Sequence, residues 1–357
     1  MSSKTLRMTL ALTAALFLAA AVAPGVQAQQ FKAEYRLTLN VGPAFYWGMG
    51  GTKFTELVKE KTKGKINLKP YYSSELLKGA QLNVAQMVAK GVIDCAMEST
   101  INVSTVIPEA NVFHLPFFIN GFEKLDKMKA GGSGQAVFAA FEKLGLKPLA
   151  WGENGFRQLT NSKKAVLKPE DLKGLRIRVV GNPLFVDIFR QLGADPVNMN
   201  WADAVAGFQQ GVVDGQENPV GVIVPLQVFQ YHKYATFWNY LVDPLVFFWN
   251  KEQWAAFPPD IQKAITAAAV EAGRFEIALC RAGLDGDKSI NVLKNEFKHT
   301  MEVAEPVKYL ESKGMTVTNL KADQVKAFVD ATKPVLDKYI SQVGQEVVNK
   351  AKADMGQ

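Results

Sequence analysis

Strand-like and helix-like segments alternate along the first part of the chain. The run 35–41 alternates apolar and polar side chains, which is typical of a strand with one buried face. Further strands are predicted at 66–72 and 92–97, and helices at about 46–63 and 78–90, the second capped by Ser73 and Ser74. This β-α-β-α-β order predicts a right-handed, mostly parallel sheet with helices on its faces.

The same alternation returns in the second part of the chain. The pattern predicts strands at 146–151, 175–180 and 194–198, and helices at 184–192 and 201–211. The apolar run 240–250 is long enough to return the chain to the first lobe. A helical period then begins at Pro258 and extends to about His299, which is too long for one lobe.

We therefore predict an α/β protein of two lobes. Each lobe has a mostly parallel sheet flanked by helices, and two crossover strands and a long bridging helix join them. The predicted first lobe comprises 29–151 plus about 244–285, and the second comprises 152–243 plus about 286–357. The chain is too long for a single small core, which agrees with this division.

The first 28 residues have the pattern of a cleavable signal peptide. Lys4 and Arg7 precede an apolar run at 10–22, and small residues end at Ala28, so the mature chain is predicted to begin near Gln29. The alternative is an uncleaved anchor, but the apolar run is shorter than the ~20 residues that a membrane span needs. We expect a soluble periplasmic protein.

Composition and charge add little to this picture. Hydrophobic residues make up 48% and charged residues 21% of the chain, which is ordinary for a globular protein. The formal net charge of +7 favours attraction of anionic ligands or simply reflects a solvated lysine surface. No run of basic residues interleaved with aromatics predicts nucleic-acid binding. The two cysteines, Cys95 and Cys280, could form one disulfide, but we favour two buried thiols.

The residues that usually carry catalysis do not form a recognisable set. The three histidines lack the spacing of metal ligands, and no nucleophile elbow or phosphate-binding loop is present. The run 48–51 is rich in glycine and opens a predicted helix, but it lacks the third glycine of a dinucleotide site. We therefore expect no enzyme activity, no cofactor and no metal.

The segment 174–219 combines a strand that carries arginines with polar amides at a turn. On the strand, three apolar side chains point to one face and Arg176 and Arg178 to the other. Both arginines would suit a solvated strand end. Arg178 is nearer the carboxyl end of the strand, where open α/β sheets bind ligands, so we assign it to a site and Arg176 to the surface. A guanidinium group suits a carboxylate because it forms paired, charge-assisted hydrogen bonds.

With the rest of the mature chain, this segment resembles the extracytoplasmic solute-binding subunits of tripartite ATP-independent (TRAP) transporters, the DctP family. The resemblance covers nearly the whole chain after the signal peptide, and it implies the two-lobe periplasmic binding protein fold. It implies that Arg178 clamps the carboxylate of an organic acid. It also implies that the amide of Asn218 caps the ligand, whereas local sequence alone would equally support an Asx-turn before Pro219.

The resemblance and the predicted strand ends give five further candidates for ligand binding: Arg157, Trp47, Ser74, Glu98 and Trp249. Arg157 matches a second arginine of the family, and a salt bridge to Glu98 or Glu153 is its alternative role. Trp47 is the candidate aromatic wall, with core packing as the alternative. Glu98 is suited to hydrogen-bond a hydroxyl or amine, and Ser74 follows the second strand.

The implied function is capture of a small organic anion by closure of the two lobes, followed by delivery to the small and large membrane subunits of a TRAP transporter. The protein itself is expected to be a monomer. Alternatives are a binding protein of an ATP-driven importer, a sulfonate-specific TRAP binder and a periplasmic enzyme. The family often has a proline directly after the arginine-bearing strand, where this chain has Val180-Gly181-Asn182. We therefore make no prediction of which acid is bound.

Overall fold

The computed structural model describes residues 31–357. The predicted signal peptide and its cleavage site lie outside the described residues. The strands are β1 Tyr35–Thr38, β2 Leu68–Tyr71, β3 Cys95–Ser99, β4 Leu146–Asn161, β5 Arg176–Val179, β6 Asp195–Asn198, β7 Gly215–Pro219, β8 Tyr234–Phe237, β9 Val242–Asn250 and β10 Thr316–Asn319.

The α-helices are α1 Tyr46–Lys61, α2 Val84–Ala89, α3 Thr100–Val103, α4 Phe122–Ala130, α5 Gly132–Lys143, α6 Pro183–Gln191, α7 Trp201–Gln209, α8 Val220–Ile223, α9 Lys251–Ala255, α10 Pro259–Arg281, α11 Lys288–Asn295, α12 Pro306–Ser312, α13 Ala322–Val343 and α14 Gln345–Asp354. Short 3₁₀ turns include η1 Glu75–Leu77, η2 Gln81–Asn83 and η3 Pro108–His114. Within residues 31–357 no helix is both long and apolar enough to cross a membrane.

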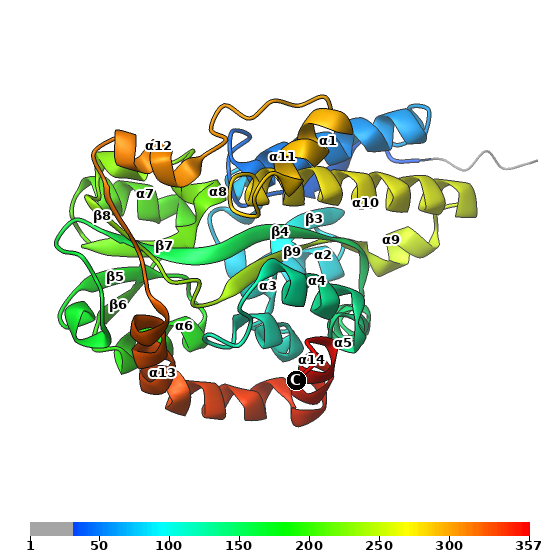
Figure 1. The fold of residues 1–357 in the computed structure, drawn as a ribbon. Helices are drawn as coiled ribbons and strands as arrows, with labels where there is room; N and C mark the ends of the chain where they lie inside the picture. Colours follow the sequence, from blue (N-terminus) through cyan, green and yellow to red (C-terminus); the bar gives the residue numbers. More distant parts are fainter. Residues whose placement is uncertain (1–30) are drawn as a thin grey trace, which may run out of the picture. The chain divides into compact units, whose positions relative to one another are not determined.

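Two parallel groups of strands are joined by a pair of long strands. β1 pairs in parallel with β2 and β3, which we call the β1 side, and β5 pairs in parallel with β6 and β7, which we call the β5 side. Between them, β9 is antiparallel to β3 and β4, and β4 is antiparallel to β7. Figure 1 shows β4 and β9 running through the middle of the molecule. The predicted fold class, with two mostly parallel sheets and two crossover strands, is confirmed.

Two predicted helices are wrong in extent. The helix that begins near Pro258 ends at Arg281 rather than near His299, because the backbone leaves the helical conformation at Ala282, where ψ is 124°, and Gly283 has a φ of +74°. A Cβ on Gly283 would lie 2.1 Å from the carbonyl oxygen of Ala304, so only a glycine lets the chain pass this close to Ala304. The predicted helix at 78–90 is reduced to η2 and α2, since Ser74 and Lys78 both have positive φ and interrupt the helical path.

The C-terminal helices α13 and α14 connect elements on both sides of the crossover strands, in addition to α10, and the sequence pattern did not predict this connection. α13 packs against α6 and η3, and α14 packs against α5 and α4 (Figure 1). One large apolar cluster links these elements to the sheet and includes Phe141, Phe189, Phe248 and Phe328, all fully buried. Both cysteines are buried and unpaired, as predicted.

A buried ion cluster fixes the crossover strand β4 against two helices. Glu153 on β4 is fully buried and accepts from Lys129 of α4 at 3.1 Å and from Arg281 of α10 at 2.8 Å. Arg281 also binds Asp126, at 2.7 and 2.8 Å. Burial raises the pKa of Glu153, but the attraction of Lys129 and Arg281 outweighs this and the net shift is downward. The carboxylate therefore stays ionised and the strand is held at this point.

Close backbone packing places α10 across α1 and β4. A Cβ added to Gly273 of α10 would lie 2.3 Å from the carbonyl oxygen of Trp151 on β4. A Cβ added to Gly50 of α1 would lie 2.5 Å from Cγ of Glu276 on α10. These glycines let α10 approach both β4 and α1 more closely than a larger side chain at either position would permit.

Gly273→Ala is expected to destabilise the protein although alanine is the better helix former. The clash is with backbone, which cannot move aside, and overpacking of this kind costs ~1–3 kcal/mol against a propensity gain of ~1 kcal/mol. Urea unfolding followed by circular dichroism measures the change. Gly132→Ala, in α5, is the control, because its nearest contact is a flexible lysine carbon at 3.4 Å. Equal stability of the two variants would contradict the packing argument.

Candidate functional site

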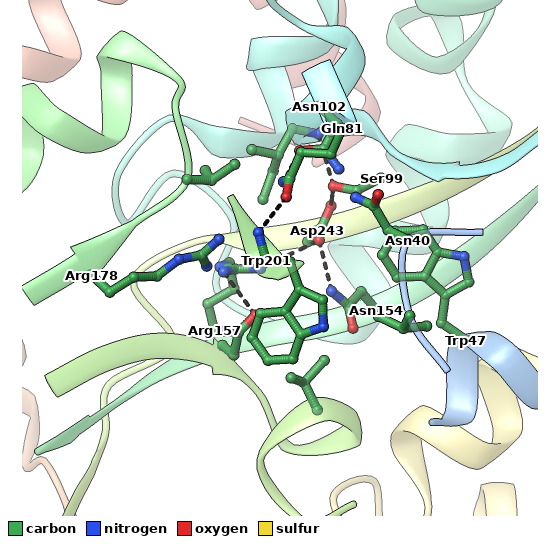
Figure 2. A pocket seen from close by; sticks show the side chains of 15 residues that line it. Asn40, Trp47, Gln81, Ser99, Asn102, Asn154, Arg157, Arg178, Trp201 and Asp243 are labelled. Atoms are coloured by element: carbon green, nitrogen blue, oxygen red, sulfur yellow. Dashed lines mark hydrogen bonds and ion pairs between the residues drawn. The ribbon is translucent and has the colours of Figure 1, made fainter. Parts of the chain in front are cut away.

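A small cavity lies between the β1 side and the β5 side. Its volume is about 40 Å³, and Figure 2 shows its lining. The side chains come from elements far apart in the sequence: Asn40, Val41, Trp47, Gln81, Ser99, Ile101, Asn102, Asn154, Arg157, Arg178, Val180, Trp201, Asn218, Val222 and Asp243. Several of them stand at the carboxyl ends of parallel strands, where such sheets commonly bind ligands.

Arg178, on β5, brings an uncompensated positive charge to this cavity. Its Nε and Nη2 both donate to the carbonyl oxygen of Met199, at 3.0 and 2.7 Å, and its guanidinium carbon lies 5.6 Å from the ring of Trp201. Within residues 31–357 Arg178 forms no salt bridge. Burial lowers the pKa of Arg178 to about 10, so the group is still protonated at neutral pH. A buried, unpaired guanidinium is suited to receive an oxyanion.

Arg157, on β4, is instead already paired. Its Nε and Nη2 bind the carboxylate of Glu217, with Nη2 at 2.8 Å from Oε1, and its Nη1 lies 3.4 Å from Oδ2 of Asp243. Burial lowers the pKa of Arg157, but the charge of Glu217 outweighs this and the net shift is upward. The predicted alternative partners, Glu98 and Glu153, are wrong, because β4 pairs here with β7 and so faces Glu217.

Asn218 and Trp47 both line the cavity, as a ligand-binding role would require. The Oδ1 of Asn218 accepts from Nη2 of Arg157 at 3.0 Å, and its Nδ2 donates to Gln216 at 2.5 Å, so the amide is oriented by β4 and β7 rather than by an Asx-turn. Trp47 donates from its indole nitrogen to the carbonyl of Met97 at 2.9 Å. Its ring is therefore fixed on the β1 side of the cavity.

Three predicted site residues lie outside the lining. Trp249 is fully buried in the core, where it packs edge-on against Tyr35 and Phe257. Glu98 and Ser74 form a layer behind the cavity. Glu98 accepts from Asn102 at 2.8 Å, and Ser74 donates to Oδ1 of Asn40. They orient amides that do face the cavity.

Burial sets the charge of Glu98. The side chain has 1% exposure, and desolvation raises its pKa to about 8, although hydrogen bonds from Asn102 and Ser99 lower it. Glu98 is therefore mostly protonated at neutral pH. A neutral carboxyl in this position adds no negative charge behind the cavity.

Sequence reasoning missed a contact that spans the cavity. The backbone N–H of Trp201, at the start of α7, donates to Oε1 of Gln81 at 2.7 Å, and Nε2 of Gln81 donates to Asn102 at 2.9 Å. The ring of Trp201 also packs edge-on against Phe45, with 6.1 Å between centroids. Gln81 and Trp201 are 120 residues apart, and no local pattern indicated their contact.

Asp243 is the second residue that was missed. Its Oδ1 accepts from Ser99 at 2.6 Å, and its Oδ2 accepts from Asn154 at 2.9 Å (Figure 2). Burial raises the pKa of Asp243 to about 6, although Arg157 lowers it. The acid interrupts an otherwise apolar crossover strand, and this break was the signal in the sequence that could have identified it.

Comparison with known families agrees with this arrangement. A family model described as bacterial extracellular solute-binding protein, family 7 (DctP), matches residues 40–303. The chain belongs to this family. The cavity between the two halves of the sheet is therefore the candidate solute site of a DctP-family protein.

Individual relatives cover most of the chain. A TRAP periplasmic solute-binding protein from Ralstonia eutropha H16, solved with bound (S)-2-acetolactate, is 42% identical, covers 91% of this chain and 99% of its own, and has a TM-score of 0.85. The 2,3-diketo-L-gulonate-binding periplasmic protein of Escherichia coli K12 is 30% identical over 79% of this chain and 85% of its own. The C4-dicarboxylate-binding periplasmic protein of Rhodobacter capsulatus is 26% identical over 88% of each.

Glu217→Gln is expected to destabilise the protein without any ligand. The substitution keeps the shape of the side chain but leaves the buried guanidinium of Arg157 without its bidentate partner, which costs ~3–5 kcal/mol for a buried pair. Urea unfolding gives the change in the free energy of unfolding. The double variant Arg157→Gln/Glu217→Gln is the control and is expected to recover part of the loss. A single variant as stable as the parent would show that Arg157 is not held by Glu217.

Proposed function

We propose that this chain is the periplasmic solute-binding subunit of a TRAP transporter, and that it captures a small organic anion in the cavity at Arg178. The observation that carries the proposal is the buried guanidinium of Arg178, whose only hydrogen-bond acceptor within residues 31–357 is the neutral carbonyl of Met199. A carboxylate in the cavity would form paired, charge-assisted bonds with it in a site from which water is largely excluded. The (S)-2-acetolactate bound to the R. eutropha relative, which is an organic carboxylate, supports this ligand class.

Binding is proposed to act by closure of two lobes around the ligand. The lobe boundaries predicted above remain a proposal, with one change: we assign α14 to the first lobe because it packs on α5 and α4. Arg178 and Asn218 come from the β5 side and Trp47 from the β1 side, so a ligand that contacts all three favours the closed form over the open one. The closed form is then proposed to engage the small and large membrane subunits.

The alternatives differ in what they predict for the bound solute. An enzyme would convert it, whereas a binding protein returns it unchanged, which mass spectrometry of the solute after incubation measures. A binding protein of an ATP-driven importer would support uptake that depends on ATP, whereas a TRAP subunit would support uptake driven by an ion gradient. The similarity to a TRAP protein over nearly all of both chains supports a TRAP subunit.

A thermal-shift screen is the direct test of the ligand class. We expect one or more organic carboxylates to raise the melting temperature, since a ligand that binds only the folded state stabilises it by ~2.7 kcal/mol at a concentration of about 100 Kd. The panel contains monocarboxylates, dicarboxylates, keto acids, sugar acids, sulfonates, neutral sugars and cationic amino acids. A shift with sulfonates alone would select the sulfonate alternative. A shift with neutral sugars or cations alone would contradict anion binding.

Arg178→Ala is expected to weaken binding of the acid that ranks first in the screen. Loss of a charged partner in a buried site costs ~2–5 kcal/mol, which corresponds to roughly thirty-fold to several thousand-fold in Kd. Arg178→Lys recovers only part, because an ammonium group lacks the planar pair of donors. Isothermal calorimetry measures the three affinities. Arg176→Ala is the matched control, since Arg176 is 45% exposed and paired with Asp214 at 2.9 Å. Binding by Arg178→Ala within about three-fold of the parent would refute the assignment.

A further inference from the structure

The charged groups that face the cavity limit the charge of the ligand it can hold. Among its lining residues, two are cations, Arg157 and Arg178, and one is an acid, Asp243. A carboxylate that leaves water must replace its hydration by bonds to cations or other donors. The number of cations that are free to pair therefore sets the number of ligand carboxylates that the cavity can compensate.

The charge of Arg157 is already compensated. Each of its three guanidinium nitrogens already has an acceptor: Nε and Nη2 bind Glu217, Nη2 also binds Asn218, and Nη1 lies 3.4 Å from Asp243. Two carboxylates thus compensate its charge before a ligand arrives. Arg178 donates only to the neutral carbonyl of Met199, so its charge remains available. The cavity offers one uncommitted cation.

Asp243 brings the opposite charge to the same cavity (Figure 2). The carboxylate is 1% exposed and is held by Ser99, Asn154 and Arg157. It is mostly ionised at neutral pH, because its pKa of about 6 lies below that value. A second ligand carboxylate would meet this like charge, and the lining residues include no further cation to pair with it. A ligand hydroxyl, in contrast, can donate to Asp243.

The remaining polar lining consists of neutral groups, which suit hydroxyl and oxo oxygens: Asn40, Gln81, Ser99, Asn102, Asn154 and Asn218. Apolar contacts come from Val41, Ile101, Val180 and Val222 and from the rings of Trp47 and Trp201. This combination fits a small acid with one carboxylate, uncharged oxygens and short apolar substituents.

We propose that the cavity selects organic acids with a single negative charge that carry hydroxyl or oxo groups, and that Asp243 is the residue that excludes dicarboxylates. The proposal rests on the function proposed above and narrows its ligand class. It separates this chain from the R. capsulatus relative, whose name gives C4-dicarboxylates as its ligands.

Isosteric pairs that differ in charge test the proposal on the unaltered protein. In one pair, 2-hydroxy-2-methylmalonate replaces the acetyl group of 2-acetolactate by a carboxylate. In another, L-malate replaces the amide of its 4-monoamide by a carboxylate. The acid that ranks first in the thermal-shift screen forms a third pair with the analogue in which a neutral end group is a carboxylate.

Calorimetry at neutral pH is expected to show each monoanion that binds to bind at least about ten-fold more tightly than its dianionic partner, a difference of ~1.4 kcal/mol. A dicarboxylate that ranks first in the screen, or that binds as tightly as its partner, overturns the proposal but leaves organic-acid binding intact. A screen in which no organic anion binds is instead a failure of the proposed function, and this narrower proposal falls with it.

Asp243→Asn tests the named residue, because the amide keeps the shape of the carboxylate and removes its charge. We expect the preference for the monoanion to shrink by about ten-fold or more, mainly through tighter binding of the dianion. Asp214→Asn is the matched control: Asp214 is also buried and paired with an arginine, Arg176, but does not line the cavity. An unchanged preference in a folded Asp243→Asn variant contradicts the role of Asp243, and the wild-type pairs decide the charge limit if that variant does not fold.

Discussion

The buried positive charge of Arg178 is the constraint on which the arrangement of the site depends. A guanidinium group that leaves water without a counter-ion costs free energy, and the fold meets that cost only in part, through the carbonyl of Met199 and the nearby ring of Trp201. The rest of that desolvation cost is offset only when an anion binds to the guanidinium group. The charge of the other arginine of the cavity, Arg157, is compensated by Glu217 and Asp243, so Arg178 is the lining cation that still lacks a counter-ion.

The paired ions perform a structural task that complements this one. Glu153, Lys129 and Arg281 fix β4 to α4 and α10, and Arg157 and Glu217 fix the same strand to β7 farther along. β4 is therefore held on both the β1 side and the β5 side. The register of β4 and β9 shifts between Glu153 and Gly155, and this irregularity occurs beside Asn154, whose side chain lines the cavity. Strong pairing on either side allows an irregular strand at the centre of the site.

Local patterns in the sequence predicted what local forces determine. Alternation at 175–180 placed Arg176 and Arg178 on one face of the strand, and the position of Arg178 nearer the carboxyl end assigned it to a site; in the structure Arg178 is buried and Arg176 is exposed. The parallel groups of strands followed from the order of elements. The ends of helices were less predictable where the backbone adopts a positive φ, as at Ser74 and Lys78, because nothing in these residue types demands that conformation. The roles of Gln81 and Asp243 depend on tertiary contacts with Trp201 and Ser99, which no single segment encodes. Trp249 was misassigned because strand position alone does not distinguish a core face from a cavity face.

The hydrogen bond between Gln81 and the backbone of Trp201 has a consequence for how faithfully this protein could signal that it is loaded. The bond joins protein to protein across the cavity, so under the closure proposed above it would stabilise the closed form equally with and without a solute. Only interactions that require the solute make the loaded protein close more often than the empty protein. Each contact of this kind would therefore raise the fraction of empty molecules that are closed. It would reduce the difference in closed fraction between empty and loaded protein, which is the difference that a membrane partner would have to recognise. A strong bridge of this kind would tighten solute binding but would make the closed form a less reliable sign that a solute is bound.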